Sequence, residues 1–293
     1  MTLNHCKISE EFNKEDMRAL IESDLKKDLH MHTRFSDGEL TPKKLIDMRA
    51  AEGYELLAIT DHDGIGGSVA GAPYAESLGL QFIYGIEFDS VDKLGKDLHI
   101  LGYGFDPENE ILMDTLIYVL EERRERNDRF RECLNSKGYD VRPEEVWSVN
   151  NGRYVGKPTF ATVLTQKGYV KDVREAFSTI FQDPDLKAIK KVTMESRDVI
   201  DVIHTANGLA VMAHPMEQRR LDESFEEFKP RMYAIMDRMI EYGIDGIECF
   251  HPSASPEQSE LLVAYAKEHG LMITRGSDFH TMDPREYDIY HRP

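Results

Sequence analysis

Residues 56–63 read Leu56-Leu57-Ala58-Ile59-Thr60-Asp61-His62-Asp63, four apolar residues followed directly by four polar ones. A short apolar run of this kind predicts a buried strand, and the polar residues after it predict a loop that carries His62. Before this run, Pro42 and Gly53 mark the start and the end of an expected helix over residues 42–52. Helix, glycine and apolar strand in this order indicate an α/β protein in which a layer of helices surrounds a parallel sheet.

The same order recurs toward the C-terminus. We expect Ser196 to cap a helix that Gly208 ends, before a strand over residues 209–213 that delivers His214. Two more units of this kind pair a helix over 230–243 with a strand over 244–250, and a helix over 256–270 with a strand over 271–274. Side chains able to bind metal therefore follow several strands, at the sheet edge where α/β proteins assemble their sites.

Residues 105–190 break this rhythm, because they contain helical segments without a strong strand. We predict an inserted helical subdomain there, with an N-terminal extension over 1–26 and the α/β domain over 27–104 and 191–293. The insert contains the run Glu121-Glu122-Arg123-Arg124-Glu125-Arg126. Runs of mixed sign are typical of a solvated helix face, so we expect Glu122 to attract Arg126 there.

The composition limits the partners. A formal net charge of −18 argues against a broad basic face for duplex nucleic acid. Cys6, Cys133 and Cys249 are odd in number and far apart, which favours a reducing cytoplasm over a disulfide framework. No stretch approaches the roughly 18 apolar residues of a membrane helix, so we expect no membrane partner. The sequence does not indicate the oligomeric state.

Histidines and carboxylates gather in short motifs. His30 and His32 alternate, so on a strand both imidazoles point to the same face. Further motifs are Ser36-Asp37-Gly38, Asp61-His62-Asp63, Gly85-Ile86-Glu87, Asp97-Leu98-His99, Ala213-His214-Pro215 and Gly276-Ser277-Asp278-Phe279-His280. Imidazole nitrogens and carboxylate oxygens suit manganese, iron or zinc. These residues favour a multinuclear metal site, and a metal-dependent hydrolase is the leading hypothesis.

This ordered set of motifs resembles the PHP family, named for polymerase and histidinol phosphatase, and within it the TrpH/YciV-like phosphoesterases that carry a helical insert. The resemblance extends from Asp28 to about His280 and includes Leu101–Pro107 and Gly246–Pro252. It implies an α/β fold with a distorted (β/α)7 barrel of PHP type, two or three divalent metal ions, often manganese, and hydrolysis of phosphate esters.

The resemblance also implies the ligands. A first metal ion would take His30, His32, Glu87 and Asp278, a second Glu87, His99 and His214, and a third Asp37, His62 and His280. Three carboxylates against three divalent ions would leave the site about three charges positive, which would attract phosphate. A hydroxide shared by two metal ions would attack phosphorus. The catalytic residues would be Glu87 and Asp278 as ligands, with His62 or a metal-bound water protonating the leaving group.

Substrate contacts are less defined. Relatives of this subgroup commonly read Gly-Arg-Pro-His where this chain has Gly156-Lys157-Pro158-Thr159, so Lys157 would meet phosphate as a point charge. The other candidates for substrate binding are Arg219, Glu248, His251 and Arg275.

The implied activity is that of a nucleotidase. The substrate would be a small phosphorylated metabolite, a nucleoside 3',5'-bisphosphate or the 5' end of a short oligonucleotide. The altered residues Lys157 and Thr159 keep a cyclic phosphodiester or a sugar phosphate open as an alternative. A non-catalytic metal-binding PHP module is an alternative of another class, and amide hydrolysis in an amidohydrolase-like barrel is a third.

Overall fold

The computed structural model describes residues 13–149, 154–220 and 222–282. It divides into two compact units, one formed by Met1–Thr115 with Met194–Pro293 and the other by Leu116–Thr193. We call them the barrel unit and the helical unit. The predicted insert over 105–190 overlaps the helical unit, and residues 1–12 of the predicted N-terminal extension lie outside the described residues.

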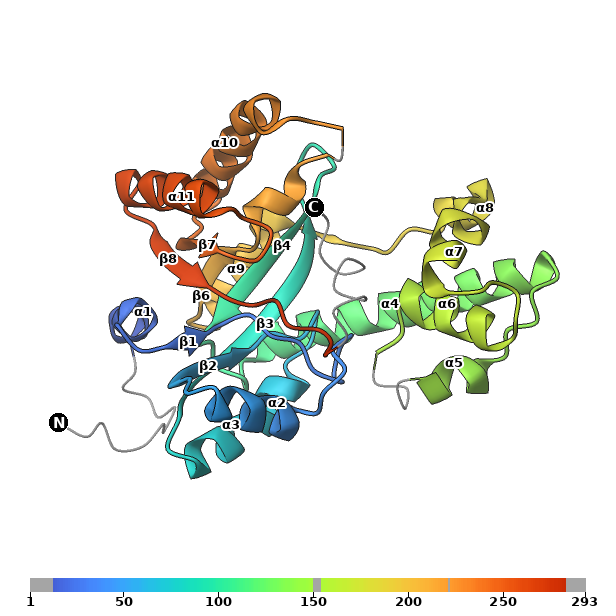
Figure 1. The fold of residues 1–293 in the computed structure, drawn as a ribbon, viewed down its shortest axis with the longest axis horizontal. Helices are drawn as coiled ribbons and strands as arrows, with labels where there is room; N and C mark the ends of the chain where they lie inside the picture. The colour runs from blue at the N-terminus through green and yellow to red at the C-terminus, as the bar shows by residue number, and fades with distance from the viewer. Residues whose placement is uncertain (1–12, 150–153, 221, 283–293) are drawn as a thin grey trace. The chain divides into compact units, whose positions relative to one another are not determined.

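The barrel unit is built around one sheet (Figure 1). Its strands follow the order β1 (Lys27–Asp28), β2 (Leu56–Ile59), β3 (Gln81–Val91), β4 (Asp97–Tyr103), β6 (Leu209–Met212), β7 (Gly246–Phe250) and β8 (Met272–Arg275), with β5 (Met194–Glu195) beside β3. Past the ends of β1 and β8, the Leu29 amide donates to the Arg275 carbonyl, and Met31 bridges to Phe279. The predicted barrel-like α/β fold is therefore confirmed.

One strand differs from the expected parallel arrangement. β4 runs antiparallel to both β3 and β6, whereas the β1–β2, β2–β3, β6–β7 and β7–β8 pairs are parallel. The reason is the short turn between β3 and β4, in which the Asp92 amide donates to the Lys96 carbonyl and Gly95 adopts a φ of 73°. Such a turn joins only antiparallel strands, since a parallel pair needs a crossover.

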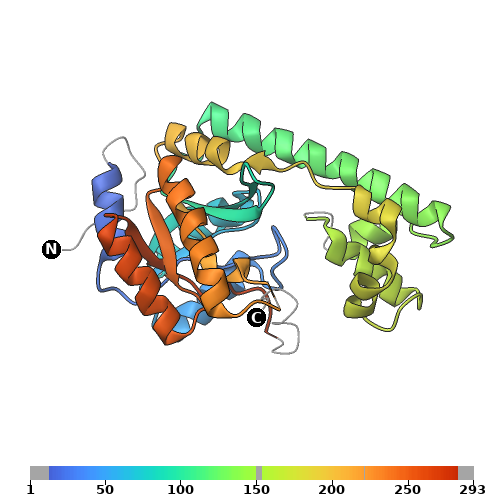
Figure 2. The same cartoon turned by 90° about the horizontal axis from the view of Figure 1, so that it is seen from above.

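Helices cover the sheet as α2 (Pro42–Ala51), α3 (Gly66–Ser77), α9 (Ser196–Thr205), α10 (Phe225–Glu241) and α11 (Pro256–Glu268). Figure 2 shows α10 and α11 side by side, where the rings of Tyr233 and Tyr265 stack at 5.3 Å. The start predicted for α10 at Pro230 is wrong, because Ser224 and Glu227 form a capping box that begins the helix earlier. Among the described residues, no helix has the length and apolar character needed to cross a membrane.

The interior of the barrel is apolar at one end. Ile21 of helix α1 (Lys14–Glu22) belongs to one apolar core with side chains from five strands and the residues that follow them, namely Leu29, Leu56, Ala58, Ile83, Leu101, Tyr103, Leu209, Val211, Ala213 and Met272. This core fills the barrel at the end where the strands begin. Polar side chains are left to gather at the opposite, carboxyl-terminal end.

The helical unit has its own core. It contains most of α4 (Glu110–Ser136), followed by α5 (Pro143–Val149), α6 (Lys157–Gln166), α7 (Val173–Ser178) and α8 (Pro184–Ala188). Phe130 of α4 packs against Phe160 and Phe181, with ring centroids 5.1 and 5.2 Å apart. The charged run of α4 is not a uniformly solvated face, because Arg123 and Arg126 are only 6% and 5% exposed.

A glycine after β8 allows the two ends of the sheet to meet. A Cβ built on Gly276 would lie 2.1 Å from the Cβ of His30 and 2.8 Å from Glu248 Oε1. We expect G276A to lower the free energy of unfolding by about 1–3 kcal/mol, as overpacking does, in a urea titration. In the control G64A, the added Cβ meets only the His62 carbonyl at 3.7 Å, so its midpoint should hardly move. An unchanged midpoint for G276A would contradict this close packing.

Candidate metal centre

Glu87 lies at the middle of a cluster of imidazoles. Glu87 belongs to β3 and is only 1% exposed to solvent. The carboxylate lies within 3.3 Å of a ring nitrogen of five histidines, His30, His32, His62, His99 and His214. These histidines follow β1 and β2, lie within β4, or follow β6, so Glu87 joins side chains from four parts of the sheet.

A first group of ligand atoms comes from His30, His32, Glu87 and Asp278, whose atoms lie within 4.8 Å of one another. Asp278 Oδ1 lies 3.2 Å from His30 Nε2 and 3.0 Å from His32 Nε2. Both of these nitrogens are buried and make no hydrogen bond to the described residues. The two Nε2 atoms therefore face the same space as the Glu87 and Asp278 carboxylates. This arrangement is expected of four ligands to one cation.

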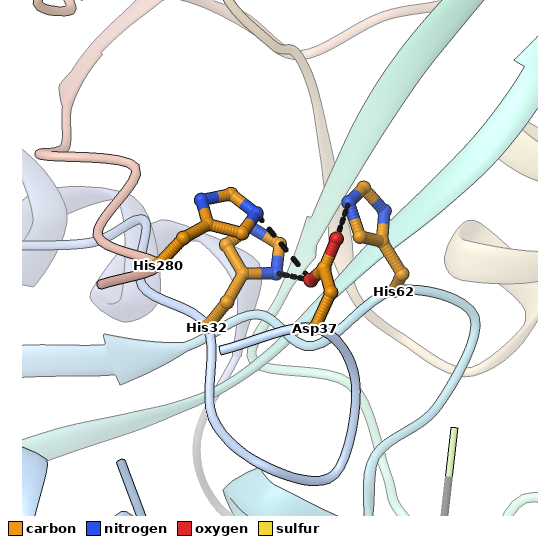
Figure 3. A group of neighbouring side chains, drawn as sticks. All are labelled: His32, Asp37, His62 and His280. Atoms are coloured by element: carbon orange, nitrogen blue, oxygen red, sulfur yellow. Dashed lines mark ion pairs between the residues drawn. The ribbon is translucent and has the colours of Figure 1, made fainter. Parts of the chain in front are cut away.

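A second group surrounds Asp37 and is shown in Figure 3. The carboxylate lies 3.6 Å from His32 Nδ1, 3.7 Å from His62 Nε2 and 3.3 Å from His280 Nε2. His280 is oriented by its other nitrogen, which lies 2.8 Å from the Asp278 carbonyl. The set predicted for a third metal ion therefore comes together, with His32 beside it.

A third group is formed by His62, Glu87 and His99. His99 Nδ1 lies 2.9 Å from Glu87 Oε1, and His62 Nδ1 lies 3.3 Å from Glu87 Oε2. His214 reaches the same carboxylate, with Nε2 at 3.0 Å from Oε1. The predicted partners of the second metal ion thus all contact Glu87, and His62 stands between the second and third groups.

Asp89 is a residue that the motifs did not indicate. Its Oδ1 lies 3.1 Å from His99 Nε2 and 3.3 Å from His62 Nδ1. In the sheet, Asp89 pairs directly with His99 across the antiparallel β3–β4 ladder. The signal was available, since a residue two positions after Glu87 on a strand points to the same face. A carboxylate that contacts the second ring nitrogen of a histidine ligand fixes the tautomer and the orientation of its imidazole. Asp89 makes such a contact with Nε2 of His99, whose Nδ1 faces Glu87.

Other carboxylates hold the loops that carry the ligands. Asp61 accepts hydrogen bonds from the amide and hydroxyl of Thr33 and from those of Ser36, at 2.6–3.1 Å, and so fixes the loop that presents Asp37. Asp63 Oδ1 accepts from the Asp89 amide at 3.0 Å. Through these contacts, Asp61 and Asp63, which flank His62, orient the loops and strand of the site.

Of the predicted substrate residues, Glu248 and His251 lie next to the ligands. Glu248 is fully buried, with Oε1 3.1 Å from His30 Nδ1 and Oε2 accepting from the His214 amide at 2.8 Å. That position suits orientation of His30 better than contact with a substrate. His251 Nε2 lies 3.3 Å from Asp278 Oδ2, and its Nδ1 lies 2.7 Å from Ser253 Oγ.

Of the three predicted basic residues, Arg219 and Arg275 belong to the barrel unit and Lys157 to the helical unit. Arg275 ends β8 and stacks on the Phe250 ring at 4.4 Å to the centroid. Arg219 follows the short 3-10 helix Pro215–Gln218. Lys157 is the first residue of α6 in the helical unit.

The backbone is constrained at three of these loops. Asp63, His214 and Asp278 adopt φ angles of 48°, 25° and 49°, although none is glycine. Positive φ at residues with a Cβ is sparsely populated and persists only where the surroundings enforce it, often at functional sites. Two of these residues are predicted ligands and the third flanks His62.

The titration behaviour fits cation binding. Burial disfavours the imidazolium of His32, yet Asp278 and Glu87 raise its pKa to about 10. Burial likewise opposes ionisation of Glu87, yet the surrounding histidines hold its pKa well below the ordinary value. Burial lowers the pKa of His62 to about 4, despite the nearby Glu87 and Asp37. The site thus stabilises positive charge beside Glu87, which divalent ions bound by these residues would supply.

The family model described as the PHP domain matches residues 28–248. The chain belongs to the PHP family. Among solved structures, this PHP chain is similar to a Bifidobacterium adolescentis protein classed as a metal-dependent phosphoesterase, with a TM-score of 0.75 and 28% identity over 92% of this chain and 98% of that one. The predicted family and fold are thereby confirmed, and the PHP chain is a metal-dependent phosphoester hydrolase.

Three curated relatives span nearly the same length. A 3',5'-nucleoside bisphosphate phosphatase of Chromobacterium violaceum is 32% identical over 90% of both chains. A phosphoribosyl 1,2-cyclic phosphate 1,2-diphosphodiesterase of Eggerthella lenta is 30% identical over 86% of this chain and 93% of its own. A 5'-3' exoribonuclease of Haemophilus influenzae is 29% identical over 87% and 90%. The PHP chain is thus similar to enzymes with different substrates.

Metal binding should release protons. In the metal-free PHP protein, the carboxylates keep the pKa of His30 well above its ordinary value despite burial, and that of His32 at about 10. The His32 imidazole is then charged at pH 7, and the pKa of His30 is shifted in the same direction, so protons must leave before these nitrogens can act as ligands. We expect proton release on metal loading, and an affinity that rises with pH. Calorimetry in buffers of different ionisation enthalpy measures this, and loading without proton release would contradict it.

Asp89 should support metal binding through His99. We expect D89N to weaken metal affinity by about 10- to 100-fold, the usual effect of losing a carboxylate that orients a ligand. The measurement is competition with a chromogenic chelator, followed by metal analysis of the protein. The control is D97N, since Asp97 lies on the same β-hairpin but is exposed. Equal affinity for D89N and D97N would remove Asp89 from the site.

Proposed function

We propose that this PHP protein removes phosphate from a small nucleotide, either a nucleoside 3',5'-bisphosphate or the 5' end of a short oligonucleotide. The observation that carries the proposal is the contact of Glu87 with five imidazoles, beside Asp37 and Asp278. A buried cluster of imidazole nitrogens and carboxylates of this kind has one evident use, which is to hold several cations close together.

We propose that manganese occupies the cluster, with iron or zinc as alternatives, in two or three positions. Such ions lower the pKa of water and neutralise charge on a phosphoryl group. Glu87 would join the ions as a bridging ligand, and Asp278 would bind beside His30 and His32. His62, whose burial lowers its pKa to about 4, is neutral at pH 7 and therefore suited to ligation. That pKa disfavours His62 as the proton donor to the leaving group.

The named activities of the relatives support the choice of substrate. The relative from Chromobacterium violaceum is a bisphosphate phosphatase and the one from Haemophilus influenzae is an exoribonuclease, so nucleotide phosphates are the shared class. A second candidate is a cyclic phosphodiester, favoured by the Eggerthella lenta relative and by Lys157 and Thr159 in place of arginine and histidine. A non-catalytic role is disfavoured, because all nine predicted ligand positions hold competent side chains.

The test is phosphate release by the manganese-loaded protein. We expect inorganic phosphate from adenosine 3',5'-bisphosphate, and none after treatment with a chelator. We expect E87Q to lower kcat/KM on the order of 10²- to 10³-fold, because the bridging charge is lost. The control E108Q changes an exposed glutamate of the same unit and should leave the rate unchanged.

Two results would overturn parts of this proposal. Turnover of a cyclic ribose phosphate without release from the bisphosphate would replace the nucleotide substrate by the cyclic ester. Near-native turnover by metal-replete E87Q would remove the bridging role. Circular dichroism of E87Q separates a failure to fold from a failure to bind metal.

A further inference from the structure

Arg49 of α2 contacts both segments that meet where the sheet closes. β1 and β8 stand at opposite ends of the strand order, and each is followed by residues of the metal centre. His30 and His32 follow β1, whereas Asp278 and His280 follow β8. The Arg49 side chain is only 9% exposed, although it carries a permanent charge. A buried guanidinium is stable only where the protein supplies its partners.

One edge of the guanidinium joins the two segments. Arg49 Nε lies 2.9 Å from Asp28 Oδ2, at the end of β1, and Nη2 donates to Ser277 Oγ at 2.8 Å, shortly after β8. Arg49 Cζ also lies over the Phe279 ring, 5.3 Å from its centroid. Arginine presents its donors in a rigid planar fork, so these contacts fix the separation of Asp28 and Ser277.

Asp28 and Ser277 are also bonded to each other. Ser277 donates from its amide to Asp28 Oδ1 at 2.9 Å, and from its hydroxyl to Asp28 Oδ2 at 2.7 Å. The His30 amide donates to Asp28 Oδ1 at 3.4 Å. Asp28 is only 1% exposed, and a buried carboxylate without a cation is strongly destabilising. Arg49 supplies that cation, so the junction of the two segments depends on it.

The residues beside this junction are proposed metal ligands. Asp28 is two residues before His30, and Ser277 directly precedes Asp278. His30 Nε2 and Asp278 Oδ1 lie 3.2 Å apart. Asp278 has a φ of 49°, a conformation that persists only where its surroundings enforce it. A displacement of one segment against the other would change the separation of these two ligand atoms, on which binding of a shared cation depends.

We propose that Arg49 is a positioning residue of the metal centre, which holds the segment after β8 against the segment after β1 so that Asp278 and His30 bind one cation. Arg49 acts through Asp28 and Ser277. The inference rests on the metal centre of the proposed function, but not on the identity of the substrate.

The experiment measures the manganese affinity of the full chain by competition with a chromogenic chelator, with Mn²⁺ alone as the probe. We expect R49M to weaken manganese binding about tenfold, the lower end of the range for groups that orient a ligand. R49K keeps a charge beside Asp28 but loses the planar fork, so it should recover only part of the affinity.

Glu52 provides a matched control. Arg49 Nη1 donates to Glu52 Oε2 at 2.8 Å, so E52Q alters a partner of the same guanidinium. Glu52 lies at the end of α2, and its side chain is 45% exposed. We therefore expect E52Q to leave the contacts with Asp28 and Ser277 intact and to bind manganese like wild type.

Thermal unfolding separates positioning from support of the fold alone. R49M should lower the Tm of the metal-free protein, since Asp28 loses its cation. Bound metal stabilises the folded protein according to its affinity, so a tenfold loss removes about 1.4 kcal/mol of that stabilisation. The rise in Tm on manganese loading should therefore be smaller for R49M than for wild type. An arginine that only supports the fold would lower both Tm values equally and leave the affinity unchanged.

The outcomes are distinct. Weaker binding by R49M beside wild-type binding by E52Q supports the inference. Wild-type affinity in R49M overturns it, and so does an equal loss in R49M and E52Q. Should R49M not fold, S277A removes only the hydroxyl between Arg49 and Asp28, and unchanged affinity in S277A would overturn the inference. Absence of manganese binding by the wild type would overturn the metal centre of the proposed function and this inference with it.

Discussion

The packing of five imidazoles around the Glu87 carboxylate is the constraint on which the barrel unit depends. A buried carboxylate is unfavourable unless positive charge or donors surround it. Here the donors come from His30, His32, His62, His99 and His214, and they are spread along the chain from β1 to the end of β6. The sheet must therefore close almost completely before Glu87 has its partners, so the site and the fold form together.

The direction of β4 determines which side chains can take part. Because β4 returns through the short turn after β3, His99 lies opposite Asp89 and near Glu87. The strands β1, β2 and β6 place their histidines just beyond their carboxyl ends. The antiparallel β3–β4 pair instead supplies His99 from within β4. The same pairing places the Asp89 carboxylate against Nε2 of His99. A departure from the regular α/β repeat thus adds a supported ligand to the centre.

Local patterns predicted much of this structure. The strand over residues 56–59, the helix from Pro42 and the helix from Pro256 follow from apolar runs, prolines and glycines that lie within a few residues of one another. The predicted ligands come together because a strand of known direction fixes where its end lies. The spacing of Asp89 from Glu87 indicates that both lie on the same face of β3, but the contact of Asp89 with His99 depends on the cross-strand register, which local patterns do not give. The burial of Arg126 depends on packing against another segment, which its charged neighbours in sequence do not reveal.

The proposed metal ligands account for phosphate chemistry, but they do not explain the choice of substrate. Relatives of 29–32% identity carry three different activities, so membership of the family does not by itself decide the substrate. In a chain of net charge −18, a phosphate ester approaches against repulsion, which salt screens beyond about 8 Å. At shorter range the charges that count are those without an internal partner. Among the described residues of the helical unit, Arg126 and Lys157 form no salt bridge, so their charges are not compensated there.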